Sequence, residues 1–314
     1  MGRALPGGRL LNELTRAGRL GRVRATAYTK LTLALRVVGR RADGFHDLDA
    51  LTVSVADPHD VVEVAAVPHP GGITFELVGE TEGVPVGSDN IAVRAGESLM
   101  LRAGRSGHGV RMTLRKKIPA GAGLGGGSAD AAAAIIAIQR LLDVEIDAAG
   151  ILELGASVGS DVPFCLTGGA VRVRGRGEVL DPVELAAGVP VLVAIPPFRI
   201  STPRVYAAWD ELGGPRSRRI IEAPPAIAGV LPELVNDLEP AAEAVEPRLV
   251  EFREALERAA GAPALLAGSG SAYAVMFSGS DERATSLARK VRRALKVPVA
   301  ASQTVSRGVR LGSR

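Results

Sequence analysis

Near the start of the chain, apolar and polar side chains alternate with the two-residue period of a β-strand. The clearest run has an apolar residue at every second position: Leu31, Leu33, Leu35 and Val37. The intervening side chains share the other face, so Lys30 and Thr32 are expected side by side on a half-buried strand that begins at Val23. Further strands are expected at 61–67 and 72–77, which predicts a half rich in antiparallel sheet.

Longer periodic segments downstream predict helices with strands between them. In the middle of the chain we expect helices at 91–103, 128–142 and 148–158, a strand at 109–116, and a hairpin that opens at Gly168–Gly169 and ends near Leu180. After residue 190 we expect strands near 191–195, 273–277 and 298–305, and helices near 203–212, 236–244, 246–260 and 281–295. The helix at 128–142 is apolar on most faces, so it must be buried.

This mixture of strands and helices predicts an α+β fold. The pattern is interrupted at 186–190, where we place a boundary between an N-terminal domain, 23–185, and a C-terminal domain, 186–306. Residues 1–22 form a basic extension, for which two explanations stay open: disorder, or an upstream start codon. Residues 307–314 are expected to form a tail.

Composition narrows the class of protein. The 314 residues are 46% hydrophobic and 23% charged, as in soluble globular enzymes. A net charge of +4, concentrated in arginines near both ends, and an aromatic content of 3% argue against a nucleic-acid partner, which would need side chains that stack on bases.

Cys165 is the only cysteine, which excludes an intrachain disulfide and a thiolate metal cluster. No apolar stretch of about 18 residues or more is present, so no membrane partner is expected. We therefore expect a cytoplasmic protein.

The most distinctive segment has glycine at five of the seven positions 121–127, between a predicted strand and the buried helix. Glycine lets the backbone approach an anion closely, and the N–H groups at the start of the helix attract negative charge. The segment is therefore expected to bind phosphate. Ser128 is expected either to cap the helix or to direct its hydroxyl at a phosphate or its magnesium ion.

Two other interpretations of this segment stay open. The spacing Gly121-x-Gly123-x-x-Gly126 also fits the dinucleotide-binding pattern, but residues 116–119 separate these glycines from the strand, and no acidic residue ends a second strand. A flexible surface turn is the other alternative, although glycine linkers seldom run straight into an apolar helix.

Lys30 and Asp161 complete a set of groups suited to phosphoryl transfer. Such a reaction needs a phosphate cradle, a cation to neutralise charge, and a base that deprotonates the acceptor hydroxyl. Taken singly, Lys30 could be a solvated strand residue and Asp161 a cap in a turn. Gly-Lys-Ser/Thr, His-Arg-Asp and Asp-Phe-Gly sequences are all missing, which excludes a P-loop NTPase and a protein kinase.

In these features the chain resembles the GHMP kinase superfamily. The three motifs of the superfamily have counterparts at Lys30, at 119–128 and at 268–270. The resemblance implies a two-domain fold, with an N-terminal α/β domain like domain 2 of ribosomal protein S5 and a ferredoxin-like α+β C-terminal domain.

Within the superfamily, residues 23–305 are similar to the family of 4-diphosphocytidyl-2-C-methyl-D-erythritol kinases. The similar stretches are 41–46, 89–90, 116–128, 159–163 and 236–239. The resemblance implies ATP-dependent phosphorylation of the C2 hydroxyl of that cytidine diphosphate alcohol in the non-mevalonate isoprenoid pathway. The alternatives are another GHMP kinase for mevalonate-type, homoserine or sugar substrates, a dinucleotide-dependent oxidoreductase, and a silent binding protein.

The resemblance also implies roles for single residues. Asp161 takes the proton from the acceptor hydroxyl, and Lys30 stabilises the anionic transition state. Phe45 stacks on the cytosine, and His46 bonds its polar edge. Acceptor binding also falls to Thr32, which replaces the usual asparagine, and to Gly268, Ser269 and Gly270. ATP, with magnesium near Ser128, is assigned to Lys116, Pro119, Ala120, Gly121, Ala122, Gly123, Leu124, Gly125, Gly126, Gly127 and Ser128. The oligomeric state is expected to be a monomer or a homodimer.

Overall fold

The computed structural model describes residues 21–68, 71–184, 187–214, 234–277 and 279–312. The expectation for the basic extension therefore lies almost entirely outside the described residues. The N-terminal half is built around a long antiparallel hairpin of β1 (Val23–Arg40) and β2 (His46–Val67), joined by the turn that Asp43 and Gly44 predicted.

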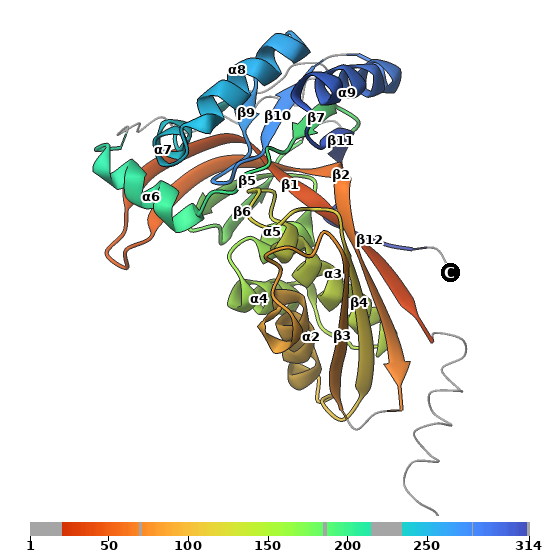
Figure 1. The fold of residues 1–314 in the computed structure, drawn as a ribbon. Helices are drawn as coiled ribbons and strands as arrows, with labels where there is room; N and C mark the ends of the chain where they lie inside the picture. Colours follow the sequence, from red (N-terminus) through yellow and green to blue (C-terminus); the bar gives the residue numbers. More distant parts are fainter. Residues whose placement is uncertain (1–20, 69–70, 185–186, 215–233, 278, 313–314) are drawn as a thin grey trace, which may run out of the picture.

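Further strands extend this hairpin into a large sheet. In the N-terminal half these are β3 (Gly72–Gly79), β4 (Gly109–Lys116), β5 (Ala170–Gly175) and β6 (Val179–Pro182). Strands β4 and β5 pair antiparallel with β2, as expected for a half rich in antiparallel sheet, and β3 runs parallel to β4. One face of β1–β4 is covered by α2 (Ile91–Arg102), α3 (Gly126–Leu141) and α5 (Val162–Thr167), with α4 (Ala148–Val158) packed against these helices (Figure 1). The short helix η1 (Gly87–Asp89) precedes α2.

The C-terminal half forms a second layer of strands and helices. Its strands are β7 (Pro190–Ala194), β8 (Val235–Asn236), β9 (Leu265–Leu266), β10 (Tyr273–Met276), β11 (Val299–Val305) and β12 (Val309–Leu311). Its helices are α6 (Thr202–Glu211), α7 (Glu239–Val245), α8 (Arg248–Ala260) and α9 (Asp281–Leu295), of which α8 and α9 lie over β7, β9 and β10 (Figure 1).

Backbone hydrogen bonds join the two halves. Strand β11 pairs with β7 on one side and with β2 on the other, which gives the order β12-β1-β2-β11-β7-β10-β9. Within the segment expected to form a tail, β12 adds to β1, with Ala25 opposite Leu311. The boundary at residue 186 stays a prediction. No helix among the described residues could cross a membrane.

A bulge in β1 decides which side chains reach the site. Thr32 pairs with Thr52 and Ala34 with Leu51, so Leu33 is an extra residue in the strand. An extra residue reverses the faces beyond it. Leu31 and Leu33 therefore pack in one core cluster and Leu35 in another. The expectation of a single face for Leu31, Leu33, Leu35 and Val37 was wrong, whereas Lys30 and Thr32 do line the same cavity. The half-buried strand was also wrong, because Thr32 is only 5% exposed.

The residues around Glu239, at the start of α7, predict a pH dependence of stability. Burial raises the pKa of Glu239 to about 7; Arg253 opposes this shift, and Glu243 adds to it. The folded protein thus holds a proton that the unfolded chain releases near pH 4.5, so the free energy of unfolding falls as the pH rises between these values. Glu239→Gln should remove that fall, with a gain of at most about 3 kcal/mol at pH 8 and little change at pH 4.5.

Urea unfolding at the two pH values measures this difference. Glu254→Gln, at an exposed position of α8 and 3.5 Å from Arg258, is the control and should change the free energy of unfolding by less than about 0.5 kcal/mol at both pH values. Equal effects of Glu239→Gln at both pH values would contradict the assignment.

Candidate active site

The glycine loop between β4 and α3 is held from two sides. The backbone N–H of Lys30 in β1 donates to the carbonyl of Leu124 at 3.1 Å, and the N–H of Ala272 donates to Ala122 at 3.0 Å. A Cβ on Gly123 would lie 2.6 Å from the Ala267 carbonyl oxygen and from Gly270. Only glycine therefore fits where the loop meets the turn that follows β9.

Helix α3 begins with a different cap from the one that the sequence suggested. Its N-cap is Gly125 in the left-handed conformation, with φ of 67°, so Ser128 is not the cap and lies inside the first turn. Of its two expected roles, the one that remains is a hydroxyl directed at a ligand, and Ser128 does line the cavity beside the loop.

Lys30 and Asp161 meet, as the sequence predicted. Lys30 Nζ donates to Asp161 Oδ2 at 2.7 Å, although β1 supplies the lysine and the start of α5 supplies the aspartate. Asp161 holds the N-cap position of α5, but its side chain makes no capping bond. The carboxylate is 38% exposed and the lysine 17%, so both side chains remain accessible to a ligand.

Two cavities converge on this ion pair. The larger, of about 510 Å³, extends from Lys30 and Asp161 to Phe45 and His46. The smaller, of about 410 Å³, is lined by the whole loop 119–128 and by residues at 84–85 and 89–91. Lys30, Asp161, Thr202 and Ser269 line both cavities. A ligand in each cavity would therefore bring its reactive end to the same two charged groups.

An aromatic group lies at the far end of the larger cavity. The Phe45 side chain is 54% exposed, which rules out a core role, and the Arg176 guanidinium lies 4.1 Å from its ring centroid. His46 stacks on Tyr206, with ring centroids 4.8 Å apart, and its Nε2 is 2.8 Å from an oxygen of Asp210. The ring of Phe45 is thus available to a flat ligand.

The remaining predicted acceptor residues divide into two groups. Thr32, Gly268 and Ser269 line the larger cavity, where the Thr32 hydroxyl is 3.4 Å from that of Thr52 and Ser269 bonds Thr202 at 2.9 Å. Gly270 is buried against the glycine loop and is not among the lining residues of either cavity. Its observed contacts are with the loop.

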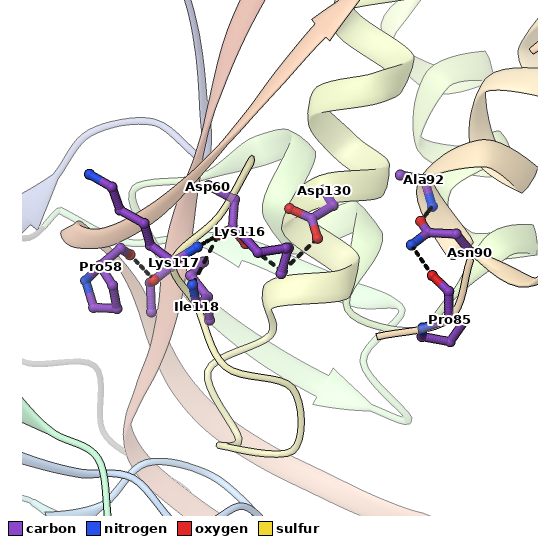
Figure 2. Close-up of polar contacts among 10 residues, drawn as sticks. Pro58, Asp60, Pro85, Asn90, Ala92, Lys116, Lys117, Ile118 and Asp130 are labelled. Atoms are coloured by element: carbon purple, nitrogen blue, oxygen red, sulfur yellow. Dashed lines mark hydrogen bonds and ion pairs between the residues drawn. The ribbon is translucent and has the colours of Figure 1, made fainter. Parts of the chain in front are cut away.

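Lys116 is buried in a charge cluster behind the loop. Its Nζ donates to Asp60 at 2.5 Å and to Asp130 at 2.7 Å, and Asp60 also accepts from the backbone N–H groups of residues 117 and 118 (Figure 2). Burial would lower the pKa of Lys116, but the two carboxylates more than offset it and raise that pKa, while burial raises the pKa of Asp130. Lys116 borders the smaller cavity, but the contacts of its ammonium group are internal.

Several residues of this region escaped the sequence analysis. Asp60 and Asp130 carry no motif of their own, and both are buried where they bond Lys116 at the end of the neighbouring strand β4. Asn90 was noted, but not its function: it caps α2 by accepting from Ala92 and donates to Pro85 at 2.8 Å (Figure 2). The Ser-Asp-Asn sequence before a predicted helix was the available signal for this cap.

The close contact of Gly123 with the turn after β9 yields a testable difference between two glycine variants. Gly123→Ala places a methyl group against backbone atoms, whereas Gly121→Ala, at a similar φ of 77°, meets only the Arg199 side chain at 3.5 Å. Both variants bear the left-handed penalty of about 1–2 kcal/mol, so the difference between them isolates the clash. Gly123→Ala should weaken ATP binding by about tenfold more than Gly121→Ala, measured by calorimetry. Equal losses of ATP affinity in the two variants would contradict the role of the Gly123 contact in holding the loop.

The Lys116 cluster yields a stability prediction. Lys116→Met leaves two buried carboxylates without their partner and should lower the free energy of unfolding by about 3 kcal/mol or more. Lys117→Met, at the exposed neighbouring position, should change it by less than about 0.5 kcal/mol. Urea unfolding of both variants tests the contrast, and a small effect of Lys116→Met would show that the cluster does not stabilise the fold.

Comparison with known proteins agrees with this geometry. Residues 90–169 match the family model of the GHMP kinases N terminal domain. Over 79% of its length this chain is 37% identical to the 4-diphosphocytidyl-2-C-methyl-D-erythritol kinase of Pelotomaculum thermopropionicum, of which 86% is covered. Over 82% of its length it is 38% identical to the kinase of the same name from Cereibacter sphaeroides, of which 90% is covered.

Solved structures give the same assignment. The crystal structure of 4-(cytidine 5'-diphospho)-2C-methyl-D-erythritol kinase matches with a TM-score of 0.74 at 35% identity, covering 90% of this chain and 98% of that one. A homoserine kinase from Cytophaga hutchinsonii matches with a TM-score of 0.68 at 20% identity, covering 94% of this chain and 98% of that one. At this identity the match supports the fold and nothing more. The α+β GHMP fold is thereby confirmed and the dinucleotide alternative is wrong. This chain belongs to the 4-diphosphocytidyl-2-C-methyl-D-erythritol kinase family of the GHMP kinases.

Proposed function

We propose that the chain transfers the γ-phosphoryl group of ATP to the C2 hydroxyl of 4-diphosphocytidyl-2-C-methyl-D-erythritol, a step of the non-mevalonate isoprenoid pathway. Family membership supports the substrate pair. The observation that carries the mechanism is the convergence of two cavities on Lys30 and Asp161. A phosphoryl donor in one cavity and an alcohol in the other meet at a cation and a base.

ATP binds in the smaller cavity, with its phosphates on the glycine loop. The N–H groups at the start of α3 and the helix dipole attract the phosphates. The glycines of the loop have no side chains that would keep the phosphates away from the backbone. The segment at 84–91 lines the other end of this cavity and receives the nucleoside.

Magnesium is expected with ATP, and the donor set fits it. Mg²⁺ keeps several waters and takes few protein oxygens besides the phosphates, so the Ser128 hydroxyl, in the cavity that Asp161 also lines, is a suitable ligand. The ion would neutralise charge on the phosphates during transfer.

Asp161 is the base of the reaction. It accepts the proton of the C2 hydroxyl as the oxygen forms its bond to the γ-phosphorus, and the bond from that phosphorus to the β-phosphate oxygen breaks to release ADP. Lys30, 2.7 Å from Asp161 Oδ2, orients the carboxylate and stabilises the charge on the transferring group.

The acceptor lies along the larger cavity. Its cytosine stacks on Phe45 and its polar edge bonds His46, which Asp210 and Tyr206 hold in place. Thr32, Gly268 and Ser269 line the part near the reacting hydroxyl. A cytoplasmic location and a monomeric or homodimeric state stay predictions.

Asp161→Asn tests the base. The amide keeps the shape but cannot accept the proton, so turnover should fall by at least about 10²-fold, while ATP affinity stays within about twofold. ADP release with and without the cytidine diphosphate acceptor measures turnover, and calorimetry measures ATP binding. Asp181→Asn, on exposed strand β6 and paired with Arg174 at 2.7 Å, is the control and should remain active. Near-normal turnover of Asp161→Asn would refute the assignment.

The same assay also tests the acceptor. ADP release that rises with mevalonate, homoserine or a sugar, and not with the cytidine diphosphate alcohol, would show that the chain phosphorylates a different alcohol.

A further inference from the structure

Arg176 is a cation in the acceptor cavity for which the reaction scheme has no role. It lies in the turn between β5 and β6, and its side chain is 43% exposed. The guanidinium lies 4.1 Å from the centroid of the Phe45 ring, and its ion pair with Asp43, at 3.7 Å, is longer than a hydrogen bond. Both contacts are weak enough for a ligand to replace.

The turn that carries Arg176 is packed against the catalytic segment. Gly177 has φ of 121°, and a Cβ there would lie 3.1 Å from the carbonyl oxygen of Ser160, the residue before Asp161. Arg176 therefore lies on a turn that contacts the segment of Asp161, while its guanidinium lies over Phe45. In the proposed acceptor pose, the ribose and the diphosphate join the cytosine to the reacting alcohol, and the diphosphate is the charged part of this connection.

The other charged groups of this cavity already have partners. Among the described lining residues, the permanently basic side chains are Lys30 and Arg176, and Lys30 is bonded to Asp161. The carboxylate of Asp210 is 2.8 Å from His46 and 3.4 Å from Arg40. Arg176 has carboxylates nearby, because Asp43 lies 3.7 Å from its guanidinium and Glu178 accepts from its backbone N–H at 2.5 Å. Among the described lining residues it is nevertheless the basic side chain that forms no carboxylate bond as short as that of Lys30.

We infer that Arg176 binds the diphosphate of the acceptor and selects alcohols linked to a nucleoside diphosphate. A guanidinium can donate two parallel N–H bonds to phosphate oxygens, which a lysine cannot reproduce. In the free protein, stacking on Phe45 keeps the guanidinium near the path of the diphosphate, so little ordering is needed on binding. The inference rests on the proposed function, because that function defines which end of the cavity holds the base.

Binding of cytidine diphosphate and of cytidine tests the inference, since the two probes differ only in the diphosphate. Arg176→Gln should lower the affinity for cytidine diphosphate by about tenfold or more and leave cytidine within about twofold, measured by calorimetry. Arg176→Lys should recover part of the loss. In steady-state assays, Arg176→Gln should raise KM for the acceptor and leave kcat and the KM for ATP nearly unchanged.

Arg174→Gln is the matched control. Arg174 precedes Arg176 by two residues, is similarly exposed at 47%, and bonds Asp181 outside the cavity, so both probes should bind this variant as they bind the wild type. Equal losses for cytidine and cytidine diphosphate in Arg176→Gln would overturn the inference, because they would indicate a role limited to supporting Phe45. An unchanged affinity for both would overturn it as well.

Failure of the proposed function can be distinguished from failure of the inference about Arg176. Absence of ADP release by the wild type with ATP and the cytidine diphosphate alcohol contradicts the function, whereas the ratio of the two binding affinities tests Arg176 by itself.

Discussion

The close approach of the glycine loop to the turn after β9 is the constraint on which the site depends. At this point Gly123 and Gly270 are in contact, and the backbone N–H of Lys30 bonds the next loop residue, Leu124. These contacts therefore position three parts relative to one another: the glycine loop, the strand that carries Lys30, and the turn of the C-terminal half that reaches the loop.

A buried charge cluster supports this loop from behind. Asp60 binds the backbone of residues 117 and 118 and, through Lys116, is linked to Asp130 in the first turns of α3. Both ends of the glycine loop are thus attached to one point in the core. Burying three charges is costly unless each is bonded, so the cluster favours a single position of the loop over others. Rigidity there benefits catalysis, since phosphoryl transfer depends on positioning.

The sequence predicted the elements and the reacting pair better than it predicted faces and contacts. Periodicity located most helices and strands within a few residues, and the local motifs identified Lys30, Asp161 and the glycine loop. The bulge at Leu33 could not be anticipated, because one extra residue leaves the alternation unchanged while it reverses the faces. The internal partners of Lys116 were missed for a different reason: they lie 56 and 14 residues away, and a single sequence does not indicate such pairs.

Thr32 stands where the usual motif has asparagine, and it lines the cavity to which we assign the acceptor. Thr32 has one short hydroxyl, which already lies 3.4 Å from that of Thr52, so it offers a ligand less than an amide would. In the proposed pose, the charged pair of Lys30 and Asp161 serves any alcohol, so discrimination between alcohols falls to the part of the cavity where Phe45, His46 and Arg176 gather. Because these side chains would bind parts of the acceptor that do not react, their loss should weaken binding more than it slows the chemical step.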